Sequence, residues 1–162
     1  MRPTVFNAPS ELKFVRDLES FYNSSIGQMI IGNRSLYLLR NAASKTKGLG
    51  FAQAGNFYPD FLLWLIDDVT GKQWLSFIDP KGIYHLSLNH PKFGLYKEVK
   101  EIQKQLADPN LILNAFILSV TKFSDLININ DSLTQQNLED RHILFMDTSE
   151  QRYLEEMFAR MK

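Results

Sequence analysis

The stretch from residue 57 to 82, FYPDFLLWLIDDVTGKQWLSFIDPKG, constrains the fold more than any other part of the chain. Two apolar runs rich in aromatic and β-branched residues, 61–66 and 73–78, flank the turn-forming segment DDVTGK. This pattern predicts an antiparallel hairpin. Asp60 opens the first run and Asp79 closes the second, and the point midway between them falls inside the turn. We therefore expect the hairpin to place these two carboxylates side by side.

Lys81 follows two residues after Asp79. If the second strand continues that far, its period of two places both side chains on one face of the sheet. Two acids and a lysine then share one end of the hairpin. Adjacent acids repel each other unless a cation lies between them, which favours a binding site. The alternative interpretation is an ordinary hairpin with surface acids at its ends and one exposed lysine.

The pattern Pro59-Asp60 followed by Asp79-Pro80-Lys81 resembles the PD-(D/E)XK nuclease superfamily, in which PD begins one strand and the D/E-X-K triplet ends its hairpin partner. The surrounding residues, FYPDFLLWL and FIDPKGIYH, are similar to the endonuclease domain that ends the restriction subunit of type III restriction enzymes. This similarity extends over about residues 10–120. The resemblance implies an α/β fold with a restriction-endonuclease-like αβββαβ core, a mixed central sheet flanked by helices.

Hydrophobic periodicity predicts further elements around the hairpin, and their order matches that core. They are a helix over 11–22 with Ser10 as its N-cap, a strand over 35–40, a helix over 93–106, a buried strand over 111–120, a strand over 142–146 and a helix over 149–161 that begins with a capping box of Thr148 and Gln151. The length of 162 residues fits a single domain. We expect a core over about residues 10–120 and a C-terminal strand-helix extension over about 121–162, whose purpose the sequence does not indicate.

The residue types at the hairpin ends suit phosphodiester hydrolysis. This reaction needs a nucleophilic water and neutralisation of the charge that grows on the phosphoryl oxygens, and a hard cation held by carboxylates serves both needs. Mg²⁺ typically takes one or two carboxylates together with the substrate phosphate, which Asp60 and Asp79 would supply, and Mn²⁺ would substitute for it. The resemblance implies the backbone carbonyl of Pro80 as a further ligand. Lys81 would orient the attacking water or stabilise the transition-state charge.

Glu11 is a candidate third acid. It lies near the middle of the apolar stripe of the first predicted helix, and a carboxylate directed towards a core is costly unless a positive group meets it. The resembling family has a helix-borne acid near the metal, so we assign this role to Glu11, with Glu19 on the flank of the stripe as the second choice. The alternative, in which Glu11 only favours the positive end of the helix dipole, stays open.

Basic residues precede the hairpin. Residues 23–59 contain no Asp or Glu but include Arg34, Arg40, Lys45 and Lys47, which we expect to attract a phosphate backbone towards the site. The alternative is a solvated loop with a few cations. The net charge of the whole chain is zero, with 18 basic and 18 acidic residues, which argues against tight indiscriminate binding of nucleic acid.

Several classes of protein are excluded or disfavoured by what the sequence lacks. It contains no cysteine, so disulfides, thiolate metal sites and cysteine nucleophiles are excluded, and this fits a reducing cytoplasm. The start, MRPTVFNAPSEL, has no apolar core of signal-peptide length, and no apolar run approaches the length of a membrane span. Neither a phosphate-binding glycine loop nor a G-x-S-x-G elbow is present. We therefore expect a cytoplasmic protein without a membrane partner.

These observations predict a magnesium-dependent DNA endonuclease domain of a type III restriction system. In the resembling family, a methyltransferase subunit chooses the target and the helicase portion of the restriction subunit translocates along DNA, so these are the expected partners besides DNA. No helicase motif is present, which indicates an excised domain or a stand-alone relative. The alternative function is a non-catalytic module that binds DNA or docks onto a partner with the same fold.

Overall fold

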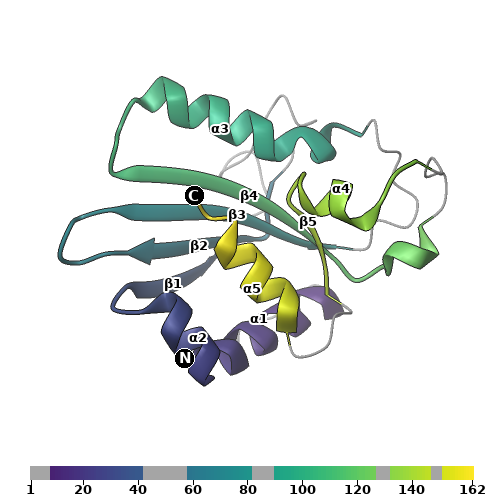
Figure 1. The fold of residues 1–162 in the computed structure, drawn as a ribbon, viewed down its shortest axis with the longest axis horizontal. Coiled ribbons are helices and arrows are strands. Elements are labelled where there is room, and N and C mark those ends of the chain that lie inside the picture. Colours follow the sequence, from purple (N-terminus) through teal and green to yellow (C-terminus); the bar gives the residue numbers. More distant parts are fainter. Residues whose placement is uncertain (1–7, 42–57, 82–89, 127–131, 147–150) are drawn as a thin grey trace.

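A five-stranded mixed sheet with helices on both faces forms the body of the protein (Figure 1). The structure is a computed structural model that describes residues 8–41, 58–81, 90–126, 132–146 and 151–162. Its elements are α1 (Pro9–Tyr22), α2 (Ser25–Ile31), β1 (Ser35–Arg40), β2 (Phe61–Ile66), β3 (Gln73–Lys81), the 3-10 helix η1 (Pro91–Gly94), α3 (Leu95–Leu106), β4 (Leu111–Ser119), the 3-10 helix η2 (Phe123–Asp125), α4 (Gln135–Glu139), β5 (Ile143–Phe145) and α5 (Arg152–Ala159).

The strands lie in the order β1-β2-β3-β4-β5. β2 is antiparallel to both β1 and β3, whereas β4 runs parallel to β3 and β5 runs parallel to β4. The predicted strands are therefore confirmed, and so is the α/β class with a mixed sheet flanked by helices. From Leu113 to Ser119 every residue of β4 is buried, as its largely apolar composition predicts.

The hairpin of β2 and β3 forms in the predicted register, with Phe61 opposite Ile78. Its turn is built by Asp67, whose side chain accepts a hydrogen bond from the Val69 amide at 2.9 Å and whose own amide donates to the Lys72 carbonyl at 2.9 Å. Gly71 adopts a positive φ of 74°, which a residue without Cβ reaches at low cost. The turn residues thus fix which residues of the two strands face each other.

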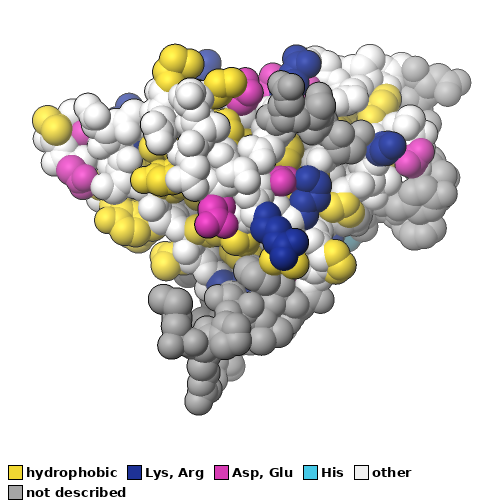
Figure 2. Space-filling view, turned by 90° about the horizontal axis from the view of Figure 1, so that it is seen from below, with side chains coloured by type: hydrophobic (Ala, Val, Ile, Leu, Met, Phe, Trp, Pro, Cys, Tyr) yellow, Lys and Arg dark blue, Asp and Glu magenta, His cyan; other side chains and the backbone are white. Residues whose placement is uncertain are grey.

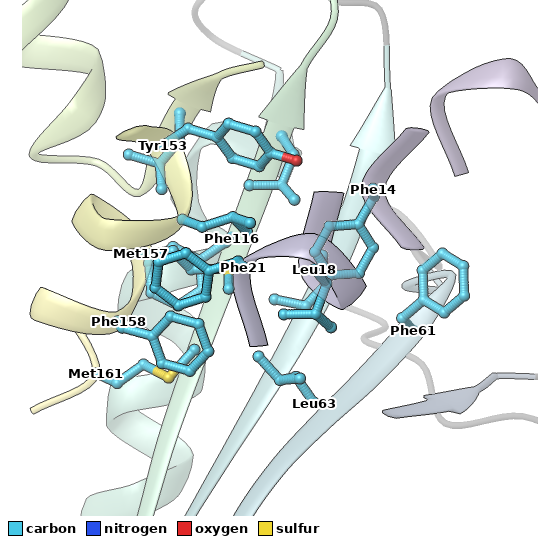
Figure 3. Close-up of a cluster of buried hydrophobic side chains, with 14 of the residues drawn as sticks. Phe14, Leu18, Phe21, Phe61, Leu63, Phe116, Tyr153, Met157, Phe158 and Met161 are labelled. Atoms are coloured by element: carbon cyan, nitrogen blue, oxygen red, sulfur yellow. The ribbon is translucent and has the colours of Figure 1, made fainter. Parts of the chain in front are cut away.

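The larger hydrophobic cluster lies between the sheet and the helices α1 and α5, which cover the lower face of the sheet in Figure 1 together with α2. Figure 3 shows aromatic rings from both helices meeting there, and the rings of Phe21 and Phe158 stack at 5.4 Å. A second cluster lies under α3 on the opposite face, where Leu95 and Val99 pack against Phe77. The sheet is therefore covered on both sides, and its alternating side chains pack into hydrophobic clusters on opposite faces.

The predicted C-terminal extension belongs to this same core. β5 adds a fifth strand beside β4, with Ile117 opposite Ile143. Leu154 and Met157 of α5 are fully buried in the cluster that also contains residues of α1. Removing residues 121–162 would therefore expose apolar surface that the rest of the domain buries.

The N-terminus of α1 differs from the prediction. The helix begins at Pro9 after Ala8, so Ser10 lies within its first turn and is not the N-cap. The Ser10 hydroxyl instead donates to the Pro80 carbonyl at 3.0 Å, which ties α1 to the end of β3. The Ser10 hydroxyl therefore bonds a residue distant in sequence and does not cap the helix, although its position after Pro9 had suggested that role.

The predicted capping box at the last helix is also wrong. α5 begins at Arg152, and its N-cap Gln151 has a left-handed φ of 60° and makes no capping hydrogen bond with its side chain. Thr148, the other predicted member, lies outside the described residues. A complete capping box occurs instead at α4, where Thr134 and Asn137 bond each other's backbone amides.

The short helix α2 was not predicted. It starts at the N-cap Ser24, whose hydroxyl accepts from the Gly27 amide at 3.0 Å. It lies between α1 and β1 as an addition to the expected order of elements. Across the described ranges, no helix combines the length and the apolar character that crossing a lipid bilayer requires.

Candidate active site

The hairpin register brings Asp60 and Asp79 together. Continuing the pairing one residue beyond Phe61 and Ile78 sets these two acids opposite each other at the end of the strand pair. Alternation along β3 places Asp79 on the same face as Phe77, which packs against α3. β3 continues to Lys81, as predicted, so the lysine shares this face.

The backbone of the first acid is fixed from β1. Asn41, the buried residue that follows β1, donates from its side chain to the Pro59 carbonyl at 2.8 Å and from its amide to the Asp60 carbonyl at 2.8 Å. Two hydrogen bonds from one buried residue hold the start of β2 in place. These hydrogen bonds therefore fix the backbone that carries Asp60 opposite Asp79.

Asp79 is the most buried charged side chain of this group, with 1% of its surface exposed. Neither of its carboxylate oxygens accepts a hydrogen bond from a protein donor among the described residues. Two ammonium groups approach instead, Lys81 Nζ at 3.9 Å from Oδ1 and Lys92 Nζ at 3.5 Å from Oδ2. A buried carboxylate with unused lone pairs is costly, so this site is built to receive positive charge.

The ionisation of Asp60 is affected by Asp79. The pKa of Asp60 is raised from 3.8 to about 7; burial is the largest cause, and the neighbouring Asp79 side chain and the negative charge of Glu11 act in the same direction. Lys81 opposes the rise. Two carboxylates placed next to each other in a half-buried position thus resist simultaneous ionisation, which is the condition that a bound cation relieves.

The two lysines have different surroundings. Burial lowers the pKa of Lys81, but the charges of Asp79, Asp60 and Glu11 outweigh it and raise this pKa above its ordinary value. Burial is the main cause that lowers the pKa of Lys92, and the nearby Lys81 contributes to the same effect. The side chain of Lys81 is 49% exposed and that of Lys92 only 15%. Lys81 is therefore the cation that faces solvent.

Glu11 lies near the acid pair but has a partner of its own. It is buried, and its Oε2 accepts a hydrogen bond from Arg40 Nη2 at 2.9 Å. The positive group that a buried carboxylate requires is therefore Arg40. Glu11 also lies in the first turn of α1, where the helix dipole favours it. Glu19, the second choice for this role, is exposed further along α1.

The predicted DNA-contacting residues are not gathered at one place. Arg40 ends β1 beside the start of β2, at the site, whereas Arg34 precedes the opposite end of β1. The Arg34 guanidinium donates to the Ile30 carbonyl at 2.6 Å and lies over the Trp74 ring at 4.9 Å. Lys45 and Lys47 lie outside the described residues.

Lys92 was not predicted to belong to the site. It lies eleven positions after Lys81, and no motif links the two residues. The contact arises because η1 packs Phe93 into a cluster with Ile117, the residue of β4 that pairs with Asp79. Only the tertiary packing of η1 against the sheet identifies this lysine.

Among the described residues, no group of three or more His, Cys, Asp or Glu side chains is arranged to hold a metal ion. The site is therefore a pair of carboxylates with a neighbouring backbone carbonyl and two lysines. Comparison with protein-family models, with curated proteins and with solved structures gave no match.

Proposed function

We propose that this chain is a magnesium-dependent DNA endonuclease domain of the PD-(D/E)XK type, related to the nuclease part of type III restriction enzymes. The main support is the juxtaposition of Asp60, Asp79 and Lys81 at one end of the β2-β3 hairpin. The order α1-β1-β2-β3-α3-β4 agrees with the αβββαβ core expected of such nucleases, with α2 inserted between its first two elements.

The residues present fit a hard divalent cation. Their donors are all oxygens, which Mg²⁺ and Mn²⁺ prefer. The Asp79 oxygens are buried and accept no hydrogen bond from the described residues, and crowding by Asp79 contributes to the raised pKa of Asp60. Asp60, Asp79 and the Pro80 carbonyl would hold the ion. The Pro80 carbonyl accepts a hydrogen bond from the Ser10 hydroxyl, and a carbonyl oxygen has two lone pairs.

When bound, the cation would supply Lewis acidity and a water of lowered pKa. The chain's own residues provide the rest. Lys81 is half-exposed and 3.9 Å from Asp79, so its ammonium group can meet a phosphate that approaches the acids. A fixed positive charge at this place stabilises the charge that develops on the phosphoryl oxygens. Asp79 in turn holds Lys81 in position.

DNA is the proposed substrate, and the helicase portion of a restriction subunit and a methyltransferase subunit are the proposed partners. Figure 2 looks at the molecule from below Figure 1, where basic, acidic and hydrophobic side chains are interspersed. This mixture agrees with the zero net charge of the chain. A domain of this kind would bind DNA weakly by itself and depend on its partners for location on the target.

The test is magnesium-dependent nicking of supercoiled plasmid. Asp79→Asn and Lys81→Ala should each reduce the nicking rate at least about a hundredfold, the size of effect seen when a transition-state contact is removed. The hairpin offers matched controls at its opposite end. Asp68→Asn removes an exposed acid that bonds Ser35, and Lys72→Ala removes a lysine that lies over Trp74. Both controls should nick at the wild-type rate.

Equal nicking by Asp79→Asn, Lys81→Ala and the two controls would refute the proposed function. Circular dichroism and thermal unfolding of all four variants establish that differences in rate do not come from loss of the fold. Addition of EDTA should abolish wild-type nicking, and Mn²⁺ should restore it.

One observation favours a second function, that of a module which binds DNA or a partner without catalysis. Asp79 lies between Lys81 and Lys92, so its charge is already balanced by protein groups. Calorimetric titration with Mg²⁺ separates the two functions, because a docking module needs no ion. Absence of any heat of binding up to millimolar Mg²⁺, with DNA bound normally, would favour the second function.

A further inference from the structure

Lys92 holds a place at Asp79 that the proposed hydrolysis does not explain. Its Nζ lies 3.5 Å from Asp79 Oδ2, while Lys81 Nζ lies 3.9 Å from the other oxygen. Each oxygen of one buried carboxylate thus has its own ammonium group. The lysine of the D-X-K triplet accounts for one of them, and the second comes from a different element of the fold.

The position of Lys92 is determined by the packing of η1. The backbone amide of Lys92 donates a hydrogen bond to Nδ1 of His90 at 3.2 Å, which caps the 3-10 helix. Pro91 restricts the backbone of the first turn. The next residue, Phe93, is buried in the cluster with Ile117. A backbone held on both sides of Lys92 delivers its side chain to Asp79, so this contact is a feature of the packed fold.

The contact of Lys92 with Asp79 differs from that of Lys81 in its distance and its exposure. It is shorter, and only 15% of the Lys92 side chain is exposed, against 49% for Lys81. Ion pairs strengthen as water is removed from around them, because the effective dielectric constant falls. Lys92 is therefore the closer and more buried of the two cations beside Asp79.

We propose that Lys92 is the resident counter-ion of Asp79 and that a divalent cation binds at Asp60 and Asp79 by displacing the Lys92 ammonium group. This inference rests on the proposed function, because it concerns the metal-binding step of the same site. Oδ2 of Asp79 cannot accept both a metal ion and an ammonium group at full strength. Like charges within a few ångströms repel, so Lys92 sets how much free cation the site needs before it fills.

The test is the affinity for Mn²⁺ and Mg²⁺, measured by calorimetry without DNA. Lys92→Met keeps an apolar stem of similar length and removes the charge. We expect it to bind Mn²⁺ at least about tenfold more tightly than the wild type, because both the competition and the repulsion are gone. The same variant should unfold at a lower temperature than the wild type in EDTA, because the buried Asp79 loses its closer counter-charge, and Mn²⁺ should reverse this difference.

Two further variants make the result specific. Lys104→Met removes a lysine from α3 that is 72% exposed and pairs with Glu101, so it changes the net charge equally and should leave the Mn²⁺ affinity unchanged. Lys92→Arg retains the positive charge and should bind Mn²⁺ within about threefold of the wild type. If Lys92→Met does not fold, Lys92→Gln removes the charge while keeping a donor for Asp79, and the same gain in affinity is expected.

Unchanged or weaker Mn²⁺ binding by Lys92→Met, with wild-type binding intact, would overturn the role of Lys92 and leave the nuclease proposal standing. A wild-type protein that binds neither Mn²⁺ nor Mg²⁺ would overturn both. The two proposals therefore fail with different results in a single set of titrations.

Discussion

Replacing Asp60 by Asn should stabilise the metal-free protein at alkaline pH. The pKa of Asp60 is raised from 3.8 to about 7 by burial and by Asp79. Between these values the native state keeps a proton on Asp60 that the unfolded chain has lost. The native state therefore binds more protons than the unfolded state, and the free energy of unfolding falls as the pH rises from about 4 to about 7. Above pH 7 this loss is complete.

The magnitude follows from the pKa change. Each pH unit between the two pKa values corresponds to 1.36 kcal/mol, which sets an upper limit of about 4 kcal/mol for Asp60. Asp60 is only partly buried, so screening by solvent reduces this limit to about 1–2 kcal/mol. Asp60→Asn should then raise the unfolding temperature at pH 8 by about 2–8 °C in EDTA, for a domain of this size.

The assay is thermal unfolding of wild type and Asp60→Asn at pH 4 and pH 8, first in EDTA and then in excess Mg²⁺. The difference between the variants should be near zero at pH 4 and favour Asp60→Asn at pH 8. Excess Mg²⁺ should reverse the order at pH 8, because only the wild type retains the full metal site. Equal stability at both pH values, or a less stable Asp60→Asn at pH 8 in EDTA, would refute the argument that the two acids repel each other.

Two further perturbations test the pair of Arg40 with the buried Glu11 and the half-buried His142. Arg40→Met should lower the free energy of unfolding in urea by about 1–3 kcal/mol, because the buried Glu11 loses the guanidinium that lies 2.9 Å away; a loss below about 0.5 kcal/mol would show that the pair contributes little. Burial lowers the pKa of His142 from 6.5 to about 4, so its contribution to stability is present above pH 6.5 and is lost as the pH falls to 4. Asn tolerates the positive φ of 60° at position 142, so His142→Asn should lose less free energy of unfolding than its parent as the pH falls from 6.5 to 4. Both proteins should carry Asp60→Asn, because Asp60 changes the stability in the opposite direction over this pH range. An identical pH dependence of the two proteins would contradict the lowered pKa of His142.

The acid pair was predictable because a hairpin is a local structure. Its register depends on the turn between Asp67 and Lys72 and on the alternation of the strands, and both are encoded within a single stretch. The same reasoning placed Lys81 on the face of Asp79. The α/β class followed from the order of apolar segments, including the continuous run that forms β4.

The remaining features of the site depend on contacts between distant segments, which local patterns do not specify. Lys92 reaches Asp79 only because η1 packs on β4, and the Ser10 hydroxyl bonds the Pro80 carbonyl across 70 positions of sequence. Ser10 looked like an N-cap because its position after Pro9 is typical of one, but tertiary packing gave its hydroxyl another partner. Whether Glu11 acts on the site or only on the helix end was open, and its pairing with Arg40 supplies the missing counter-charge.

A crystal grown with Mn²⁺ tests the central claim most directly, because anomalous scattering identifies the position of the ion. We predict a peak between the carboxylates of Asp60 and Asp79, with the Lys92 ammonium group moved away from Asp79 Oδ2. A crystal grown at saturating Mn²⁺ that shows no anomalous peak between these two acids, with Lys92 still at 3.5 Å from Asp79, would contradict the proposed metal site.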